Sequence, residues 1–268
     1  MFESKKGVDN MMDYLLIYYI FSFIIGSIIG SFLNVCIYRI PKGESIVYPP
    51  SHCPKCNNRL KWIDLIPIIS YIFLKGRCRY CKEKISIKYV LIEFFTGVVF
   101  LLLAIKYGIS LDYLKYATLF SLLIVISLID METMNIYLST TLTGIVFGLI
   151  FLIAQGVLEN YILKEYMYYI SGAIIPAGII ALIILLTGGM GWGDVEICFI
   201  SGLFLGLKLS IVMLIASFII GALISLVLIW GKKKTRKDYI PFGPFIALGT
   251  LFALAFGDKL LLWYLNLI

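Results

Sequence analysis

Two aspartates stand beside long apolar runs, and their type and position suit acid–base chemistry. Asp130 lies in SLIDMETMNIY, where a predicted membrane helix ends, and Asp194 lies in GMGWGD, where another begins. A carboxylate at a membrane helix is costly and indicates a functional site by default. If the two helix ends meet, the pair holds one proton, so that one member activates water while the other protonates a carbonyl oxygen. Such a pair hydrolyses peptide bonds without a serine, a cysteine or a catalytic metal.

Glycines flank the second aspartate. Gly191 and Gly193 have no side chains, so we expect a substrate backbone to come close to Asp194 there. The alternative is purely structural: Asp194 caps its helix and Asp130 is an interfacial end residue. Three other acids near predicted spans have weaker claims, namely Glu93, Glu132 and Glu196. The single histidine excludes a Ser-His-Asp site at this position, because it lies elsewhere in the chain.

Four cysteines form a second candidate site. They occur as CPKC and CRYC, with Cys53, Cys56, Cys78 and Cys81 as the sulfur donors and 21 residues between the pairs. Two CxxC pairs at this spacing are typical of zinc knuckles that close one tetrahedral site. We therefore expect a structural Zn²⁺. The alternatives are two disulfides or four buried thiols.

The histidine and the two other cysteines of the chain are not expected to bind the metal. His52 precedes a complete set of four thiolates, so it is a bystander rather than a ligand. Cys36 and Cys198 lie within predicted spans and lack partners at ligand spacing, which favours apolar packing.

The elements that must position these sites are membrane helices. Of 268 residues, 61% are hydrophobic and 15% charged, which excludes an ordinary soluble domain. Scanning for apolar runs long enough to cross a bilayer predicts an all-α polytopic protein of about eight transmembrane helices. The predicted spans are 14–37, 89–106, 113–129, 138–155, 166–187, 195–206, 208–230 and 241–266, of which the sixth is short.

Charge sets the predicted topology. The segment from Arg39 to Lys88 holds 11 of the 23 lysines and arginines, and KKKTRK at 232–237 holds five more. The positive-inside rule places both in the cytosol, and hence both aspartates at the cytosolic face. An anionic lipid surface explains these basic loops more simply than nucleic acid, so no nucleic-acid partner is expected. The predicted parts are a tail and first helix (1–38), a cytosolic zinc insert (39–88) and a membrane core (89–268).

Several motifs occur in one order along the chain and together resemble a known family. They are GSFLNVCIYRIP (30–41), SHCPKC (51–56), IPIISYIFLKGRCRYC (66–81), IEFFTG (92–97), IDMETMNI (129–136), GMGWGD (189–194) and IPFGPFIALG (240–249). In this order they strongly resemble the type IV prepilin peptidases, bacterial aspartic peptidases of the GxGD type. The resemblance runs from about residue 26 to 258.

The resemblance implies a bifunctional enzyme of the bacterial cytoplasmic (inner) membrane. Such an enzyme removes the basic leader of prepilins or pseudopilins at the cytosolic face, then N-methylates the new N-terminus with S-adenosylmethionine. By position in the motifs, Asp130 and Asp194 are the implied catalytic pair, and the four knuckle cysteines the implied metal ligands. Gly76 and Arg77, just before the second knuckle, are the positions associated with methylation. The residues themselves show no GxGxxG cofactor motif after a strand.

The chain departs from the family pattern at three positions. Tyr137 and Leu138 replace a Pro-Asp pair, and Glu196 replaces a lysine after GxGD, which changes the charge near Asp194. Two other functions remain as alternatives: a transporter with a zinc-stabilised cytosolic domain, and a peptidase without methyltransferase activity. Neither the particular substrate nor the oligomeric state follows from the sequence; GSIIG at 26–30 is a small-residue face that suits packing within or between chains.

Overall fold

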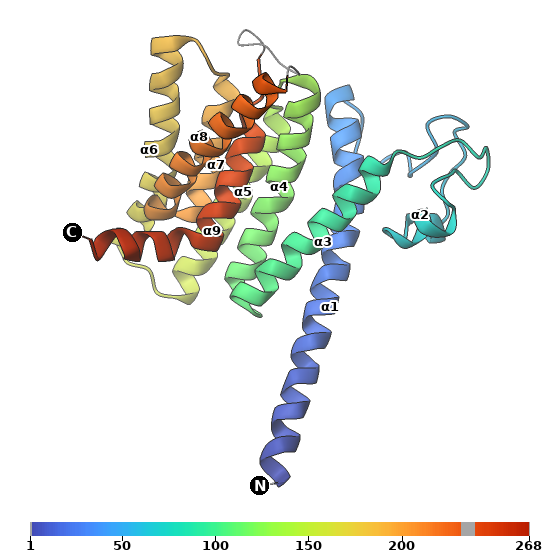
Figure 1. Ribbon diagram of the computed structural model, residues 1–268, viewed down its shortest axis with the longest axis horizontal. Coiled ribbons are helices and arrows are strands. Elements are labelled where there is room, and N and C mark those ends of the chain that lie inside the picture. The colour runs from blue at the N-terminus through green and yellow to red at the C-terminus, as the bar shows by residue number, and fades with distance from the viewer. Residues whose placement is uncertain (1, 232–238, 268) are drawn as a thin grey trace. The chain divides into compact units, whose positions relative to one another are not determined.

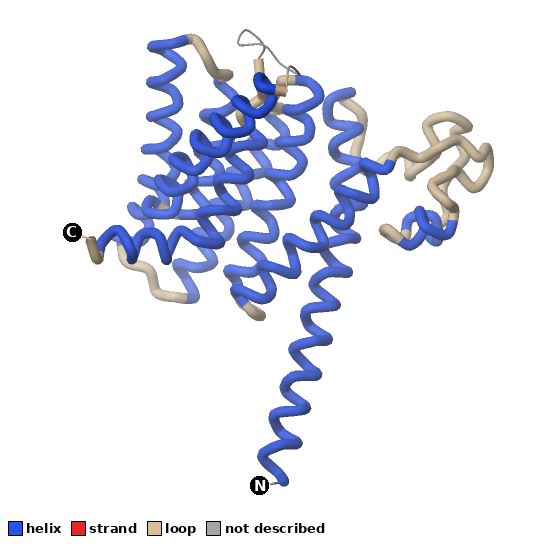
Figure 2. Tube along the Cα trace, viewed as in Figure 1, coloured by secondary structure: helices blue, strands red, loops and turns tan. Residues whose placement is uncertain are grey.

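The computed structural model describes residues 2–231 and 239–267, with residues 2–12 described by their helical backbone alone. The basic segment 232–237, expected in a cytosolic loop, lies outside the described residues. Within the described ranges the chain is made of helices and loops and has no strand (Figure 2). Two compact units, 1–117 and 118–268, divide the chain.

The first unit is built on a long helix pair. α1 (Phe2–Arg39) packs along α3 (Ile87–Tyr107), and the start of α4 (Leu111–Thr133) completes the unit (Figure 1). Glycines permit this close approach. A Cβ at Gly30 would lie 2.8 Å from the Cα of Glu93, and one at Gly26 would lie 2.7 Å from the Cβ of Phe100. The GSIIG face therefore packs within the chain.

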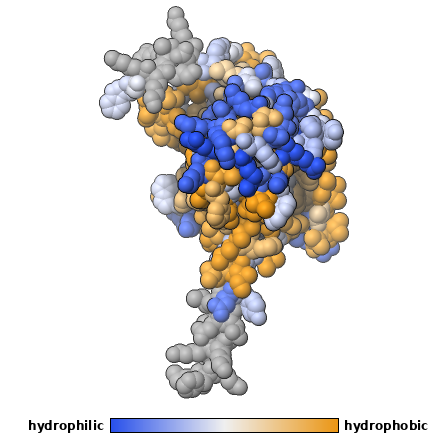
Figure 3. All heavy atoms as spheres, turned by 90° about the vertical axis from the view of Figure 1, so that its right-hand side faces the viewer, coloured by the Kyte–Doolittle hydropathy of each residue, from blue (hydrophilic) through white to orange (hydrophobic). Residues whose placement is uncertain are grey.

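The insert between α1 and α3 is mostly irregular. Its short elements are η1 (Ile40–Lys42), η2 (Trp62–Leu65) and α2 (Ile69–Phe73). Hydrophilic residues gather over this insert, whereas hydrophobic residues cover α1 below it (Figure 3). The contrast matches a polar module carried by membrane helices.

The second unit is a helix bundle. It contains the rest of α4, followed by α5 (Leu138–Leu158), α6 (Leu163–Thr187), α7 (Trp192–Leu205), α8 (Leu207–Trp230) and α9 (Gly243–Leu265). α6 packs against α7 and α8, and α8 packs against α9. The last turns of α4 and α6 and the first turns of α7 and α9 lie at one end of this unit (Figure 1).

All eight predicted spans are helices, but they differ in length. Seven helices among the described residues are long and apolar enough to cross a membrane: α1, α3, α4, α5, α6, α8 and α9. α7, the sixth predicted span, has 14 residues. At 1.5 Å per residue it is about 21 Å long, less than the ~30 Å hydrocarbon core. Gly206 alone separates it from α8, at φ +73°.

Candidate active site

Asp130 lies in the last turns of α4, and the first turn of α9 contacts it. Its side chain is buried, and its Oδ2 accepts a hydrogen bond of 3.1 Å from the N–H of Gly243. The hydroxyl of Ser127 donates to the Gly243 carbonyl at 3.4 Å. A Cβ at Gly243 would lie 2.7 Å from Oδ2 of Asp130, so a glycine is needed for this contact. Two segments distant in sequence thus fix one carboxylate.

Asp194 lies in the first turn of α7 and is also buried. Its Oδ2 accepts the N–H of Gly191 at 3.2 Å, so it does cap the helix, as the structural interpretation held. Helix capping uses one of its two oxygens. Its helix also reaches the surroundings of Asp130, because an added Cβ on Gly243 would lie 2.7 Å from Oδ2 of Asp130 and 3.0 Å from Cδ1 of Ile197, three residues after Asp194 on α7. The capping role therefore does not separate Asp194 from the surroundings of Asp130.

The two flanking glycines have different surroundings. Around Gly191 the space is open, since the nearest atom to an added Cβ would be Oδ2 of Asp194 at 3.9 Å. Gly193 instead packs against the side chain of Ile136, which an added Cβ would overlap. Open backbone thus lies beside Asp194 at Gly191, while Gly193 lets the α4–α5 connection approach α7.

The other acids that the sequence offered as candidates have different surroundings. Glu196, which departs from the family pattern, accepts a 2.6 Å hydrogen bond from the hydroxyl of Thr141 on α5. Glu132 is exposed, and Glu93 belongs to the other unit. Tyr137 precedes α5 as its N-cap, and Leu138 is the first residue of that helix. The departures therefore leave the connection after Asp130 with a regular helix start.

The four knuckle cysteines converge in the first unit. The sulfur atoms of Cys53, Cys56, Cys78 and Cys81 all lie within 4.8 Å of one another. Those of Cys53 and Cys81 are 3.8 Å apart, too far for a disulfide, and every cysteine is free. A tetrahedral zinc site with 2.3 Å Zn–S bonds has sulfur atoms about 3.8 Å apart. The donor set fits Zn²⁺.

The two knuckles fold alike. In the first, the N–H of Cys53 donates to the Asn58 carbonyl at 3.0 Å and the N–H of Asn57 donates to the Cys53 carbonyl at 2.8 Å. In the second, the N–H of Cys78 donates to Glu83 at 2.8 Å and that of Lys82 donates to Cys78 at 3.1 Å. The residue after each second cysteine has positive φ, 56° at Asn57 and 60° at Lys82.

The knuckle turns favour the thiolate at two of the four cysteines. Main-chain hydrogen bonding at Asn58 lowers the pKa of the Cys56 thiol to about 7, and main-chain hydrogen bonding at Cys81 lowers that of Cys78. The pKa of the Cys81 thiol is raised despite main-chain hydrogen bonding at Glu83, because burial and the three neighbouring sulfurs disfavour its ionised form. Ionised sulfur is the form that binds metal. His52 is outside this set, because its Nδ1 lies 3.0 Å from the Pro50 carbonyl. Cys36 and Cys198 are buried in helices, as their apolar interpretation predicts.

The residues associated with methylation lie beside the second knuckle. Gly76 is buried with φ +67°, and an added Cβ would be 2.9 Å from both Cζ and Oη of Tyr71. The backbone of Arg77 pairs with that of Lys84, and its side chain is exposed. Gly76 therefore sets the position of a tyrosine ring.

Some contacts of both sites were not foreseen from the sequence. Gly243 lies in the motif IPFGPF, which carried the resemblance but had no assigned role. Glu93 accepts the N–H of Ile68 at 2.8 Å, and Ile68 has φ +62°, a strained value for a β-branched residue. The only sequence signal for these contacts is a glycine or an acid in an apolar setting.

The chain matches two protein-family models and is similar to several known proteins. The model of the Bacterial Peptidase A24 N-terminal domain matches residues 24–107, and that of the Type IV leader peptidase family matches residues 117–226. A "Prepilin leader peptidase/N-methyltransferase" of Bacillus subtilis is 33% identical over 230 residues, which is 85% of this chain and 90% of that protein. Its namesake in Neisseria gonorrhoeae is 34% identical over 241 residues, 80% of this chain and 82% of that protein. No solved structure matches with significance.

Proposed function

Because this chain belongs to the type IV prepilin leader peptidase family, we propose that Asp130 and Asp194 are its catalytic pair. The chain is a multi-pass protein of the bacterial cytoplasmic membrane, a prepilin leader peptidase and N-methyltransferase. The observation that supports the assignment is that both carboxylates are buried in one unit and that Gly243 packs against Asp130 on α4 and against Ile197, three residues after Asp194, on α7. The location at two helix ends also agrees with a substrate whose leader is polar and whose stem is apolar.

The pair has the groups that peptide hydrolysis needs. Two like charges in a buried site do not both ionise readily, so the carboxyls hold one proton between them. The ionised member removes a proton from water, whose oxygen bonds to the scissile carbonyl carbon, and the protonated member protonates the carbonyl oxygen. Collapse of this intermediate breaks the C–N bond, and the leaving amine takes up a proton. The N–H groups of Gly243 and Gly191 orient one carboxylate each.

Substrate access is proposed at Gly191. The backbone at Gly191 is open, and its N–H donates a hydrogen bond to the adjacent carboxylate of Asp194. We propose that an extended prepilin or pseudopilin backbone approaches along this open main chain. Gly193 contributes indirectly, because its contact with Ile136 brings the end of the α4–α5 connection to α7.

The cysteine cluster is proposed to hold a structural Zn²⁺. Its four sulfurs match a closed tetrahedral set, which leaves no open position for catalysis. Residues 39–88 have few regular elements and a small core, so a metal crosslink would supply much of their folding free energy. We propose that this insert serves methylation, that 89–268 serves proteolysis, and that 1–38 serves as tail and first membrane helix.

The methyl donor is proposed to be S-adenosylmethionine. When bound, it supplies a methyl group: the free amine's lone pair forms the N–C bond, the S–C bond breaks, and its electron pair stays on sulfur as the thioether product. The amine must first lose its ammonium proton to solvent. Gly76 and Arg77, both in the insert, are proposed to support this step.

Conservative substitutions test the dyad. Asp130→Asn and Asp194→Asn should each eliminate leader cleavage, since each removes one member of the shared-proton pair. Glu132→Gln is the matched control, an exposed acid two residues beyond Asp130. Incubation of purified variants with a prepilin, followed by intact and N-terminal mass spectrometry, measures cleavage and methylation separately. Substantial cleavage by either asparagine variant would refute the assignment.

A further inference from the structure

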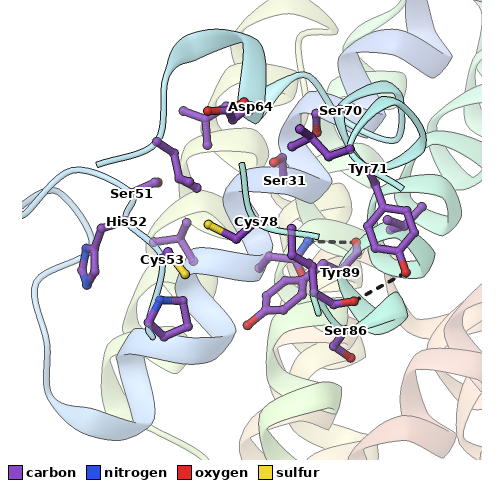
Figure 4. Close-up of a pocket in the computed structure, with 18 of the residues that line it drawn as sticks. Ser31, Ser51, His52, Cys53, Asp64, Ser70, Tyr71, Cys78, Ser86 and Tyr89 are labelled. Carbon is purple, nitrogen blue, oxygen red and sulfur yellow. Dashed lines mark hydrogen bonds between the residues drawn. The ribbon is translucent and has the colours of Figure 1, made fainter. Parts of the chain in front are cut away.

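A cavity of about 430 Å³ lies in the first unit, outside the aspartate pair. α1, α3 and the insert form its walls, and Figure 4 shows the labelled side chains that surround it. Small-molecule sites in proteins span roughly 300–1,000 Å³. The cavity is therefore large enough for a cofactor-sized ligand.

Hydrogen bonds fix the walls of the cavity. Asn34 on α1 donates to the carbonyl of Tyr89 on α3 at 3.0 Å. Arg39, buried at the end of α1, donates to the carbonyls of Ser45 and Pro49 at 2.8 and 2.7 Å. Its guanidinium is thus already engaged in holding the insert. These contacts preform the space rather than leave it to be ordered by a ligand.

A carboxylate of a membrane helix lines this cavity. Glu93 on α3 is 9% exposed, and neither proteolysis nor zinc binding uses it. Its Oε2 accepts the N–H of the strained Ile68 at 2.8 Å, and Ser31 is a second hydrogen-bond partner. Strained backbone persists where the surrounding structure fixes it, commonly at ligand sites. Glu93 therefore brings a buried carboxyl group to the cavity and shapes the loop beside it.

Aromatic rings and an exposed cation complete the lining. Tyr71 and Tyr89 present rings to the cavity (Figure 4). The buried Gly76 lies directly against Tyr71. The cavity is also lined by three exposed charged residues, Lys55, Glu83 and Lys84, whereas Arg79 is paired with Asp64 at 2.7 Å. The lining thus offers a buried carboxyl group, flat rings and exposed cations.

We propose that this cavity is the binding site for S-adenosylmethionine, an inference that rests on the proposed methyltransferase function. The ligand carries sulfonium and ammonium cations, a carboxylate and a purine ring. A bound cation favours the ionised form of the buried Glu93, which then supplies the negative charge that the cation needs in a poorly solvated place, and Lys84 is a partner for the carboxylate of the ligand. The tyrosine rings suit a purine or a sulfonium. A phospholipid phosphate fits less well, because it would meet Glu93.

Binding of the radiolabelled methyl donor to the full-length, zinc-loaded protein tests the site. In equilibrium dialysis, Glu93→Gln should weaken binding by at least about tenfold, since a buried charge-assisted contact is lost. Glu44→Gln is the control, an exposed acid of the same insert outside the cavity. It should bind like the wild type. Zinc content shows whether each variant keeps the insert folded.

Photocrosslinking of the labelled donor to the unaltered protein gives an answer that does not depend on a variant. Peptide mapping should find the label within residues 31–39, 51–60 or 64–93. If the wild type neither binds the donor nor methylates a cleaved prepilin, the proposed methyltransferase function fails. If it methylates normally but the label maps elsewhere, or folded Glu93→Gln binds as the wild type does, this site alone is overturned.

Discussion

Gly76 and Gly43 provide a matched test of how the insert supports methylation. Both are glycines with left-handed backbone, at φ +67° and +68°. An alanine at either position pays a similar backbone cost of about 1–2 kcal/mol. Their surroundings differ: an added Cβ meets Tyr71 at Gly76, and nothing within 4 Å at Gly43. The pair thus separates backbone strain from displacement of the tyrosine.

The displacement can be worked out from the contact. A Cβ at Gly76 would lie 2.9 Å from Cζ and Oη of Tyr71, whereas ordinary contact starts at 3.4 Å. The ring must move by about 0.5 Å. Tyr71 lines the cavity and Gly76 does not, so the free direction is into the cavity. Since a misplacement of about 1 Å can cost roughly 100-fold, methylation should fall on the order of tenfold in Gly76→Ala.

The assay compares three proteins with one prepilin and S-adenosylmethionine. Intact-mass analysis resolves uncleaved, cleaved and methylated pilin in the same sample. Gly76→Ala should lower methylation more than cleavage, whereas Gly43→Ala should leave both close to wild type. Each variant must retain zinc, which shows that the knuckles are folded. Equal loss of cleavage and methylation in a zinc-loaded Gly76→Ala, or equal loss of methylation in both alanine variants, would refute the reasoning.

Two further predictions concern the metal and the aspartate pair. The purified protein should contain about one Zn²⁺ per chain. The metal should be lost in Cys53→Ser and retained in Cys36→Ala, because of these two cysteines only Cys53 belongs to the four-sulfur cluster. Elemental analysis that finds no metal in a reduced, chelator-free sample of the wild type would contradict this. Gly243→Ala should slow leader cleavage by roughly 10–100-fold, since its Cβ would lie 2.7 Å from Oδ2 of Asp130. Gly178→Ala on α6, where nothing lies within 4 Å of an added Cβ, is the control, and a folded Gly243→Ala that cleaves at the wild-type rate would show that the contact is unimportant.

The sequence could predict those structural features whose residues lie close together along the chain. The CxxC pairs specify their own turns, so the four cysteines could be predicted to cluster, and their sulfurs do lie within 4.8 Å of one another. Long apolar runs likewise predicted helices correctly, including the short α7. Short-range patterns succeed because turn and helix geometry fix the relative positions of residues only a few apart.

The contacts that sequence could not predict join distant segments. Gly243 reaches Asp130 across 113 positions, and Glu93 reaches Ile68 across 25. Each uses a main-chain N–H, which every residue except proline possesses, so no residue type marks the donor. The glycine at 243 is informative only after the carboxylate is known to lie against it. Motif order identified the family, but tertiary packing decided the partners.

The position of Asp194 depends on glycines well beyond the active site. Gly202 on α7 packs against the backbone of Gly172 on α6, and a Cβ on Gly172 would lie 2.5 Å from the carbonyl carbon of Gly206. In membranes, small residues permit such backbone contact, which then holds two helices in register. α7 is a single helix of 14 residues, and Gly202 lies eight residues, or about 12 Å, beyond Asp194 along it. The glycine contact therefore also fixes the start of the helix, where Asp194 lies. The carboxylate of Asp194, proposed to be catalytic, is therefore placed from the far end of α7, while Gly191 and Gly243 orient the carboxyl groups of Asp194 and Asp130 locally.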